Sequence, residues 1–304
     1  MQYIFGPVPS RRLGLSLGIS PVPPKACNYS CVYCQLGRTD RLTNARKLFF
    51  PVETIITELE KVLAGNPAFD VATIVGEGEP TLYLGLGALI DSVKARVNKP
   101  VAVITNGALV MDPQVRTELR KADIVLMSMD AYDQPSFQKI NRPHGEIEFN
   151  QVYDGLQTFS RIYQGQLWME IMLTADNADD KHLIKFAQRL KELKYQRLYL
   201  NTPVRPPAEP NVKALDHEKM QKAVSILGGI SIDLLLSQGF HSEIPDDYAA
   251  ILSIIRRHPM NQFEIESFLK TRGCADIKGI MDRLVLDKAV TAIDYQGYTN
   301  YRLK

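Results

Sequence analysis

Short apolar runs rich in β-branched residues alternate with longer amphipathic stretches along residues 50–227. An apolar run of four to eight residues predicts a buried strand, and apolar residues that recur every three or four positions predict a helix. The candidate strands are Leu15–Ile19, Ala72–Val75, Val101–Thr105, Ile124–Met129, Leu167–Leu173 and Arg197–Asn201. The candidate helices are 52–63, 84–97, 113–121, 147–163, 180–193 and 216–227. This alternation predicts an α/β fold with a parallel sheet and crossover helices.

Six strand–helix units are too few for a closed eight-stranded barrel. Chemistry in barrels and open parallel sheets gathers at the carboxyl ends of the strands. Distinctive polar, glycine and proline residues follow four of the predicted strands at these ends. They are Gly76-Glu77-Gly78-Glu79-Pro80-Thr81, Thr105-Asn106-Gly107, Ser128-Met129-Asp130 and Asn201–Pro207.

The pattern changes after a proline-rich break at 203–210. Residues 229–244 read as a linker with a candidate strand at Ile230–Leu235. Three helices are then predicted, over 246–257, 261–270 and 275–288, followed by a hairpin around Asp294–Tyr298. Three helices and a hairpin resemble a small winged helix-turn-helix domain. The sequence therefore predicts two units, 1–228 and 245–304.

Composition is that of an ordinary globular protein, with 45% hydrophobic and 23% charged residues. No signal segment or bilayer-length apolar run is present, so we expect a cytoplasmic protein without a membrane association. The net charge is +2, but residues 1–50 carry seven Lys or Arg against Asp40 alone, a net of +6. Either this excess attracts an anionic substrate, or acidic neighbours in the fold balance it.

Three of the four cysteines, Cys27, Cys31 and Cys34, fall within eight residues. A [4Fe–4S] cluster normally takes four thiolates, so a set of three predicts a cluster with one iron open to another ligand. A structural zinc site is the alternative, although zinc prefers four ligands in two separated pairs. Cys274 lies in the C-terminal unit and is predicted to be a small core residue. Disulfides are not expected, because nothing in the chain indicates secretion.

The cysteine spacing, with Tyr33 just before the last cysteine, resembles the signature of the radical S-adenosylmethionine (SAM) superfamily. The resemblance runs from residue 5 to 207 and includes the glycine-rich motif after the second strand. It implies an open, partial (βα)6 TIM-like barrel over residues 1–228. It also implies a [4Fe–4S] cluster on Cys27, Cys31 and Cys34, with SAM chelating the open iron.

The resemblance further implies which residues bind the cofactor. Gly76 and Gly78 would let the backbone approach it, and Glu79 would hold the methionyl ammonium. Tyr33 would lie beside the adenine. The other candidates for carboxylate or ribose contacts are Thr105, Asn106, Ser128, Asp130, Arg142 and Glu170. Each of these residues also has a structural interpretation, as a strand-end cap or a packing residue.

The implied activity is reductive cleavage of SAM to a 5′-deoxyadenosyl radical, which abstracts hydrogen from a substrate. Cleavage of SAM needs a cluster of low reduction potential, and this favours a ferredoxin- or flavodoxin-type electron donor. The basic N-terminal region favours an anionic substrate, with RNA slightly preferred. Two alternatives stay open. One is a radical SAM enzyme that modifies a peptide or protein, or activates a glycyl-radical partner. The other is an iron–sulfur or zinc winged-helix transcriptional sensor.

Three segments are similar to a narrower branch, the uncharacterised iron–sulfur oxidoreductases near the wybutosine-type tRNA-modifying enzymes. They are Phe5–Gly14, Cys34–Thr39 and Asn201–Pro206. The winged-helix-like end departs from the wybutosine enzymes. Residues 246–304 carry nine Lys or Arg against eight Asp or Glu, and this near-neutral balance argues against tight duplex binding. Peptide recognition, dimerisation or a lid over the barrel are further roles, and the oligomeric state is left open.

Overall fold

The computed structural model describes residues 2–232, 239–240, 242 and 244–304. Its main feature is an eight-stranded sheet in the order β1-β2-β5-β6-β7-β8-β9-β10. β1 (Ile4–Ser10) pairs antiparallel with β2, and all the other neighbours are parallel. The other strands are β2 (Gly14–Ile19), β5 (Val71–Ile74), β6 (Val101–Thr105), β7 (Ile124–Ser128), β8 (Gln166–Met172), β9 (Arg197–Asn201) and β10 (Ile230–Ser231).

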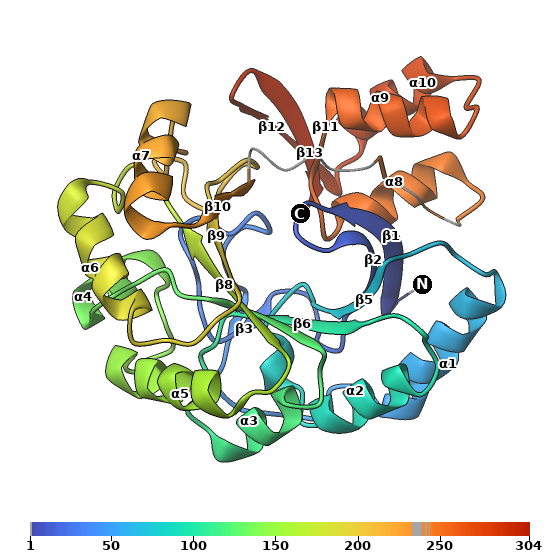
Figure 1. The fold of residues 1–304 in the computed structure, drawn as a ribbon. Coiled ribbons are helices and arrows are strands. Elements are labelled where there is room, and N and C mark those ends of the chain that lie inside the picture. The colour runs from blue at the N-terminus through green and yellow to red at the C-terminus, as the bar shows by residue number, and fades with distance from the viewer. Residues whose placement is uncertain (1, 233–238, 241, 243) are drawn as a thin grey trace.

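Helices cover the outside of this sheet, which curves into an incomplete ring (Figure 1). They are α1 (Val52–Ala64), α2 (Leu86–Lys94), α3 (Pro113–Leu119), α4 (Gln134–Ile140), α5 (Phe149–Ile162), α6 (Asp180–Leu190) and α7 (His217–Leu227). The predicted α/β fold is therefore confirmed, and an open partial barrel fits this arrangement. Within the described ranges, no helix combines the length and the apolar character needed to cross a bilayer.

Each face of the sheet carries its own apolar cluster. The larger one joins outward-facing strand residues such as Val125 and Met127 to the helices. The smaller one lies inside the ring and consists of Leu13, Val71, Ala102, Ile124, Leu126, Trp168, Tyr199 and Ile232. Successive strand residues face opposite sides, so Glu170 faces the inside together with Trp168. The inside of the ring is therefore apolar near the amino ends of the strands and polar beyond them.

Some elements were not predicted. β1 contains Gly6-Pro7, which does not look like a strand. Pro7 is tolerated here because β1 is an edge strand with a bulge between Phe5 and Val8. The short helix α4 begins at a capping box formed by Asp133 and Ser136. The remaining unpredicted elements are β3 (Ala26–Cys27), β4 (Arg41–Leu42), a 3-10 turn (Pro80–Leu82) and β11 (Met260–Asn261).

The C-terminal unit has three helices and a three-stranded antiparallel sheet. Its elements are α8 (Asp247–Ile255), β11, α9 (Gln262–Thr271), α10 (Ile277–Leu286), β12 (Val290–Tyr295) and β13 (Tyr298–Leu303). The candidate strand Ile230–Leu235 forms β10 over its first two residues, and residues 233–235 of it lie outside the described part of the chain.

This unit lies across the open side of the ring, between β1 and the end of β9 (Figure 1). On one edge, Phe5 and Val8 of β1 belong to its apolar core. On the opposite side, beyond the end of β9, the hydroxyl of Tyr295 donates to the carbonyl of Pro203 (2.7 Å), and Arg205 Nη2 donates to Glu264 Oε1 (2.6 Å). The C-terminal unit therefore bridges the edge strand β1 and the loop after β9.

A buried ion pair ties the unit to the loop after β5. Arg257 Nε lies 3.4 Å from Glu77 Oε2, and the two side chains are only 5% and 6% exposed. Burial raises the pKa of Glu77 and lowers that of Arg257, so desolvation of the two charges outweighs their attraction. Such a pair adds little net stability, but breaking it leaves one buried charge without its partner.

We therefore expect Glu77→Gln to lower the free energy of unfolding by about 3 kcal/mol, as measured by urea denaturation. The matched control is Glu266→Gln, because Glu266 and Lys270 form an exposed pair at 4.0 Å. Exposed pairs contribute little, so the control should unfold like the wild-type protein. Equal effects of the two substitutions would contradict a special role for the buried pair.

Candidate metal and cofactor site

The clustered cysteines lie on the segment between β2 and α1, here called the cysteine loop, and amide groups donate to the sulfur atoms of Cys27 and Cys31. The amide of Tyr29 donates to Cys27 Sγ (3.4 Å), and so does Asn106 Nδ2 (3.6 Å). Asn141 Nδ2 donates to Cys31 Sγ (3.5 Å). Amide donors of this kind stabilise negative charge on sulfur, as they do around iron–sulfur ligands.

The net charge of the cysteine loop depends on whether its three cysteine sulfurs are protonated. Burial raises the pKa of Cys27 to about 12 and also raises the pKa of Cys31 and Cys34. The negative charges of Cys27 and Cys34 both raise the pKa of Cys31, so the three sulfurs lie near one another. Three crowded thiolates need a cation to hold their charge, and metal binding releases the protons.

In the part of the chain that the structure describes, no three His, Cys, Asp or Glu side chains converge on one metal ion. A cubane cluster does not require this convergence, because each thiolate binds a different iron. Three cysteine sulfurs with amide donors therefore fit a [4Fe–4S] cluster.

Glu79 lies beside this loop and is fully buried. Its Oε1 accepts hydrogen bonds from the amide (2.9 Å) and the hydroxyl (2.7 Å) of Thr81 and from the hydroxyl of Thr105 (2.6 Å). Its Oε2 accepts one from the amide of Asn106 (2.8 Å). Burial raises the pKa of Glu79, and these hydrogen bonds oppose that shift. A carboxylate has about four acceptor positions, so Oε2 keeps one for a further donor.

The structure thus gathers three of the sequence candidates, Glu79, Thr105 and Asn106, next to Cys27. Asn28, which the sequence analysis missed, is buried at the same place, and its Oδ1 accepts from Asn106 Nδ2 (2.8 Å). Asn28 directly follows Cys27, and that adjacency was the only signal that could have identified it.

The two glycines of the motif are packed against protein. A Cβ at Gly78 would lie 2.0 Å from the carbonyl oxygen of Ala26, and one at Gly76 would lie 2.9 Å from Ser20 Oγ. The space beside Gly78 is therefore filled by the backbone just before Cys27. The amide of Glu79 also donates to Ala26 O (3.0 Å) and fastens the two loops together.

A second polar group joins the other end of the cysteine loop to β7. The hydroxyl of Tyr33 donates to Asp130 Oδ2, which also accepts from Asn141 Nδ2 (3.0 Å). Asp130 Oδ1 accepts from the amide of Met172 (2.9 Å). Burial raises the pKa of Asp130 to about 6. Asn141 thus contacts both Asp130 and Cys31, a role that its sequence position after a short helix did not reveal.

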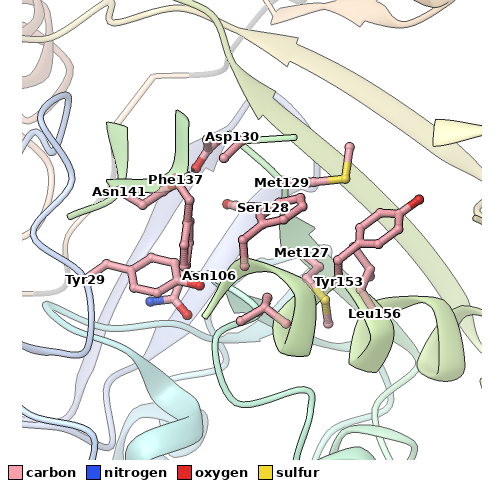
Figure 2. Close-up of a pocket in the computed structure, with 14 residues that line it drawn as sticks. Tyr29, Asn106, Met127, Ser128, Met129, Asp130, Phe137, Asn141, Tyr153 and Leu156 are labelled. Atoms are coloured by element: carbon pink, nitrogen blue, oxygen red, sulfur yellow. Dashed lines mark hydrogen bonds between the residues drawn. The ribbon is translucent and has the colours of Figure 1, made fainter. Parts of the chain in front are cut away.

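Ser128, Met129 and Asp130 follow one another at the end of β7, beside Asn141 and Phe137 (Figure 2). These residues line a cavity of about 20 Å³ that extends toward α5. This volume suits one water molecule, so the cavity is too small for a nucleoside.

Two sequence candidates point elsewhere. Arg142 has a positive φ of 46° and pairs with Glu209, which also accepts two hydrogen bonds from Arg38 (2.9 Å each). Glu170 pairs with Arg12 inside the ring. Neither residue joins the group around Glu79.

Much of the basic N-terminal region is neutralised by carboxylates. Four of its seven cations form ion pairs, namely Arg12–Glu170, Lys25–Asp40, Arg38–Glu209 and Arg46–Glu118. Asp40 is already counted in the net charge of +6, so carboxylates from outside residues 1–50 balance three of these six charges.

The family profile described as the Radical SAM superfamily matches residues 22–187, more than half of the chain. The chain therefore belongs to the radical SAM superfamily, whose enzymes use a [4Fe–4S] cluster and SAM. UPF0026 protein MJ1312 of Methanocaldococcus jannaschii is 34% identical, over 99% of this chain and 96% of that protein. A UPF0026 protein of Helicobacter pylori (strain J99) is 30% identical, over 97% of each chain.

Two solved structures share the fold. A radical SAM methyltransferase from Sphaerobacter thermophilus superimposes with a TM-score of 0.53 at 14% identity, over 72% of this chain and 67% of that one. Streptococcus suis SuiB bound to S-adenosylmethionine gives a TM-score of 0.52 at 15% identity, over 69% of this chain and 46% of that one. At these identities the similarity concerns the fold alone.

Proposed function

We propose that this enzyme reductively cleaves SAM and abstracts hydrogen from an anionic substrate, with RNA as the favoured class. The observation that carries the proposal is the contact of Glu79, Thr105 and Asn106 with the loop that holds Cys27. When bound, the cluster and SAM supply a 5′-deoxyadenosyl radical for this chemistry. The electron donor we propose is of the ferredoxin or flavodoxin type, because clusters of this kind must reach low potentials.

The residues of the chain take separate roles in this proposal. Cys27, Cys31 and Cys34 hold three irons, and the free position on Glu79 Oε2 accepts a hydrogen bond from the methionyl ammonium. Tyr33, held by Asp130, positions the adenine. Ser128 offers its hydroxyl to the ribose or the methionyl carboxylate from the end of β7. Thr105, at the end of β6, donates to Glu79 Oε1 and holds that carboxylate in place.

The charges around the ring support an anionic substrate. Arg12 points inward to Glu170, while Arg205 and Glu264 pair at the edge that the C-terminal unit covers. The pKa of His258 is lowered to about 4. Burial is the main cause, and the positive charges of Arg205 and Arg11 add to it. His258 is therefore neutral at pH 7, and the positive charges of Arg205 and Arg11 that act on this imidazole favour an anion in the ring.

The C-terminal unit is, in our proposal, a winged-helix domain that presents the substrate to the ring. Two observations support this proposal. The unit has three helices followed by a hairpin, and it lies over the open side of the ring. The similarity to the oxidoreductase branch near the wybutosine-type enzymes makes tRNA the first RNA to test.

Binding of a total tRNA mixture by the reconstituted protein should be steeply salt-dependent, because phosphate contacts release counterions. We expect the affinity in a filter-binding assay to fall roughly tenfold or more between 50 and 200 mM salt. Arg205→Gln should weaken binding. Lys99→Gln removes the same charge from an exposed position at the opposite end of the strands and should not. Salt-insensitive capture of peptides, or unchanged nucleosides in a deletion strain, would contradict RNA as the substrate.

A further inference from the structure

Arg302 extends from β13 of the C-terminal unit onto the cysteine loop. Its Nη1 donates to the carbonyl oxygen of Gln35 (3.2 Å), the residue directly after Cys34. Its guanidinium also lies beside Gly37, where a Cβ would stand 3.7 Å from Nη2. Gly37 in turn donates its amide to Cys34 O (3.1 Å). Arg302 therefore spans the turn that begins at Cys34.

The charge of Arg302 has an unusual environment. Two other arginines of the unit, Arg257 and Arg272, pair with Glu77 and Asp247. Within the described residues, no carboxylate lies within ion-pair distance of Arg302, which is half-buried. Burial lowers the pKa of Arg302, and the thiolate of Cys34 is the group that raises it. A half-buried cation is costly unless an anion accompanies it, and the anion at hand would be the Cys34 thiolate once a metal is bound.

We propose that Arg302 is a positioning residue of the cofactor site that raises the reduction potential of the cluster held by Cys34. The cluster gains one negative charge when it takes an electron from its one-electron donor. A fixed cation stabilises the reduced state more than the oxidised state, and charge near a cluster is one of the factors that set its potential. The C-terminal unit, which covers the open side of the ring, therefore also favours reduction of the cluster.

The inference rests on the proposed ligation by Cys34, which has its own test. Cys34→Ala should lose the cluster, whereas replacement of Arg302 should leave the iron content unchanged. A four-iron cluster retained in Cys34→Ala would remove the basis of the inference, whatever the Arg302 variants show.

The experiment is a redox titration of the anaerobically reconstituted full chain without SAM, followed by electron paramagnetic resonance of the reduced cluster. Arg302→Gln and Arg302→Met remove the charge, and Met keeps an unbranched side chain against Gly37. We expect both to disfavour reduction roughly tenfold, which is about 59 mV for a one-electron couple. Arg302→Lys should stay near the wild-type potential. Lys270→Gln, which removes an exposed charge from the same unit, should match the wild-type value.

A wild-type potential in either neutral variant with full iron content would overturn the proposal. An equal shift in Arg302→Lys would also overturn it, because charge would then not be the cause. Loss of the cluster from the neutral variants would overturn it as well, because Arg302 would then be needed to hold the cluster and not to set its potential.

Discussion

Replacement of any one of Cys27, Cys31 and Cys34 by alanine should abolish SAM cleavage. A cluster with one open iron has only three protein anchors, and removal of a thiolate leaves a second iron without a ligand. The iron content of anaerobically reconstituted protein should fall from about four per chain to well below that number. Formation of 5′-deoxyadenosine should fall to background in all three variants.

Cys274→Ala is the matched control for these variants. Cys274 packs against the separate core of the C-terminal unit and has Asp247 as its side-chain hydrogen-bond partner. Its loss should leave iron content and SAM cleavage at wild-type levels. Loss of the cluster from Cys274→Ala, or full activity in one of the other three variants, would be incompatible with the three-cysteine site.

Gly78→Ala should be the most damaging single methyl addition in the chain. The new Cβ would lie 2.0 Å from the oxygen, 2.8 Å from the carbon and 3.1 Å from the nitrogen of Ala26. These are backbone atoms, which cannot turn away as a flexible side chain can. We expect the free energy of unfolding to fall by about 3 kcal/mol, and one of the two loops to move.

That movement should also weaken cluster binding, because one loop carries Cys27 and the other carries Glu79. Gly145→Ala is the control, since a Cβ there would meet no atom within 4 Å and Gly145 does not have a positive φ. It should change stability by less than about 0.5 kcal/mol. Urea denaturation and iron analysis of the two variants provide the comparison, and equal stabilities would show that the two loops are not in close contact.

Short runs of apolar residues in the sequence predicted the parallel strands well, because a strand buried on both faces must be apolar along its length. Val101–Thr105 and Arg197–Asn201 have the predicted bounds. β1 was missed because Gly6-Pro7 interrupts it, and its strand character depends on pairing with β2. α4 was missed because seven residues give too little periodicity to read, and its capping box fixes where it begins.

At the site, Glu79, Thr105 and Asn106 come from short motifs and lie together beside Cys27, whereas Asn28 was missed although it lies within the cysteine motif. Asn141 and Arg302 were missed as well, because each reaches the cysteine loop from far along the chain. No local pattern records such a contact. For the same reason, the sequence left open whether the basic N-terminal region was balanced. The carboxylates of Glu118 and Glu209 come from distant segments, and only the folded chain brings them to Arg46 and Arg38.

The most direct measurement is the product formed when anaerobically reconstituted protein is mixed with dithionite and SAM. A cluster with an open iron, held beside Glu79, should convert SAM to methionine and 5′-deoxyadenosine in protein that carries about four irons per chain. Intact SAM, together with one tetrahedral zinc per chain in place of iron, would contradict the assignment.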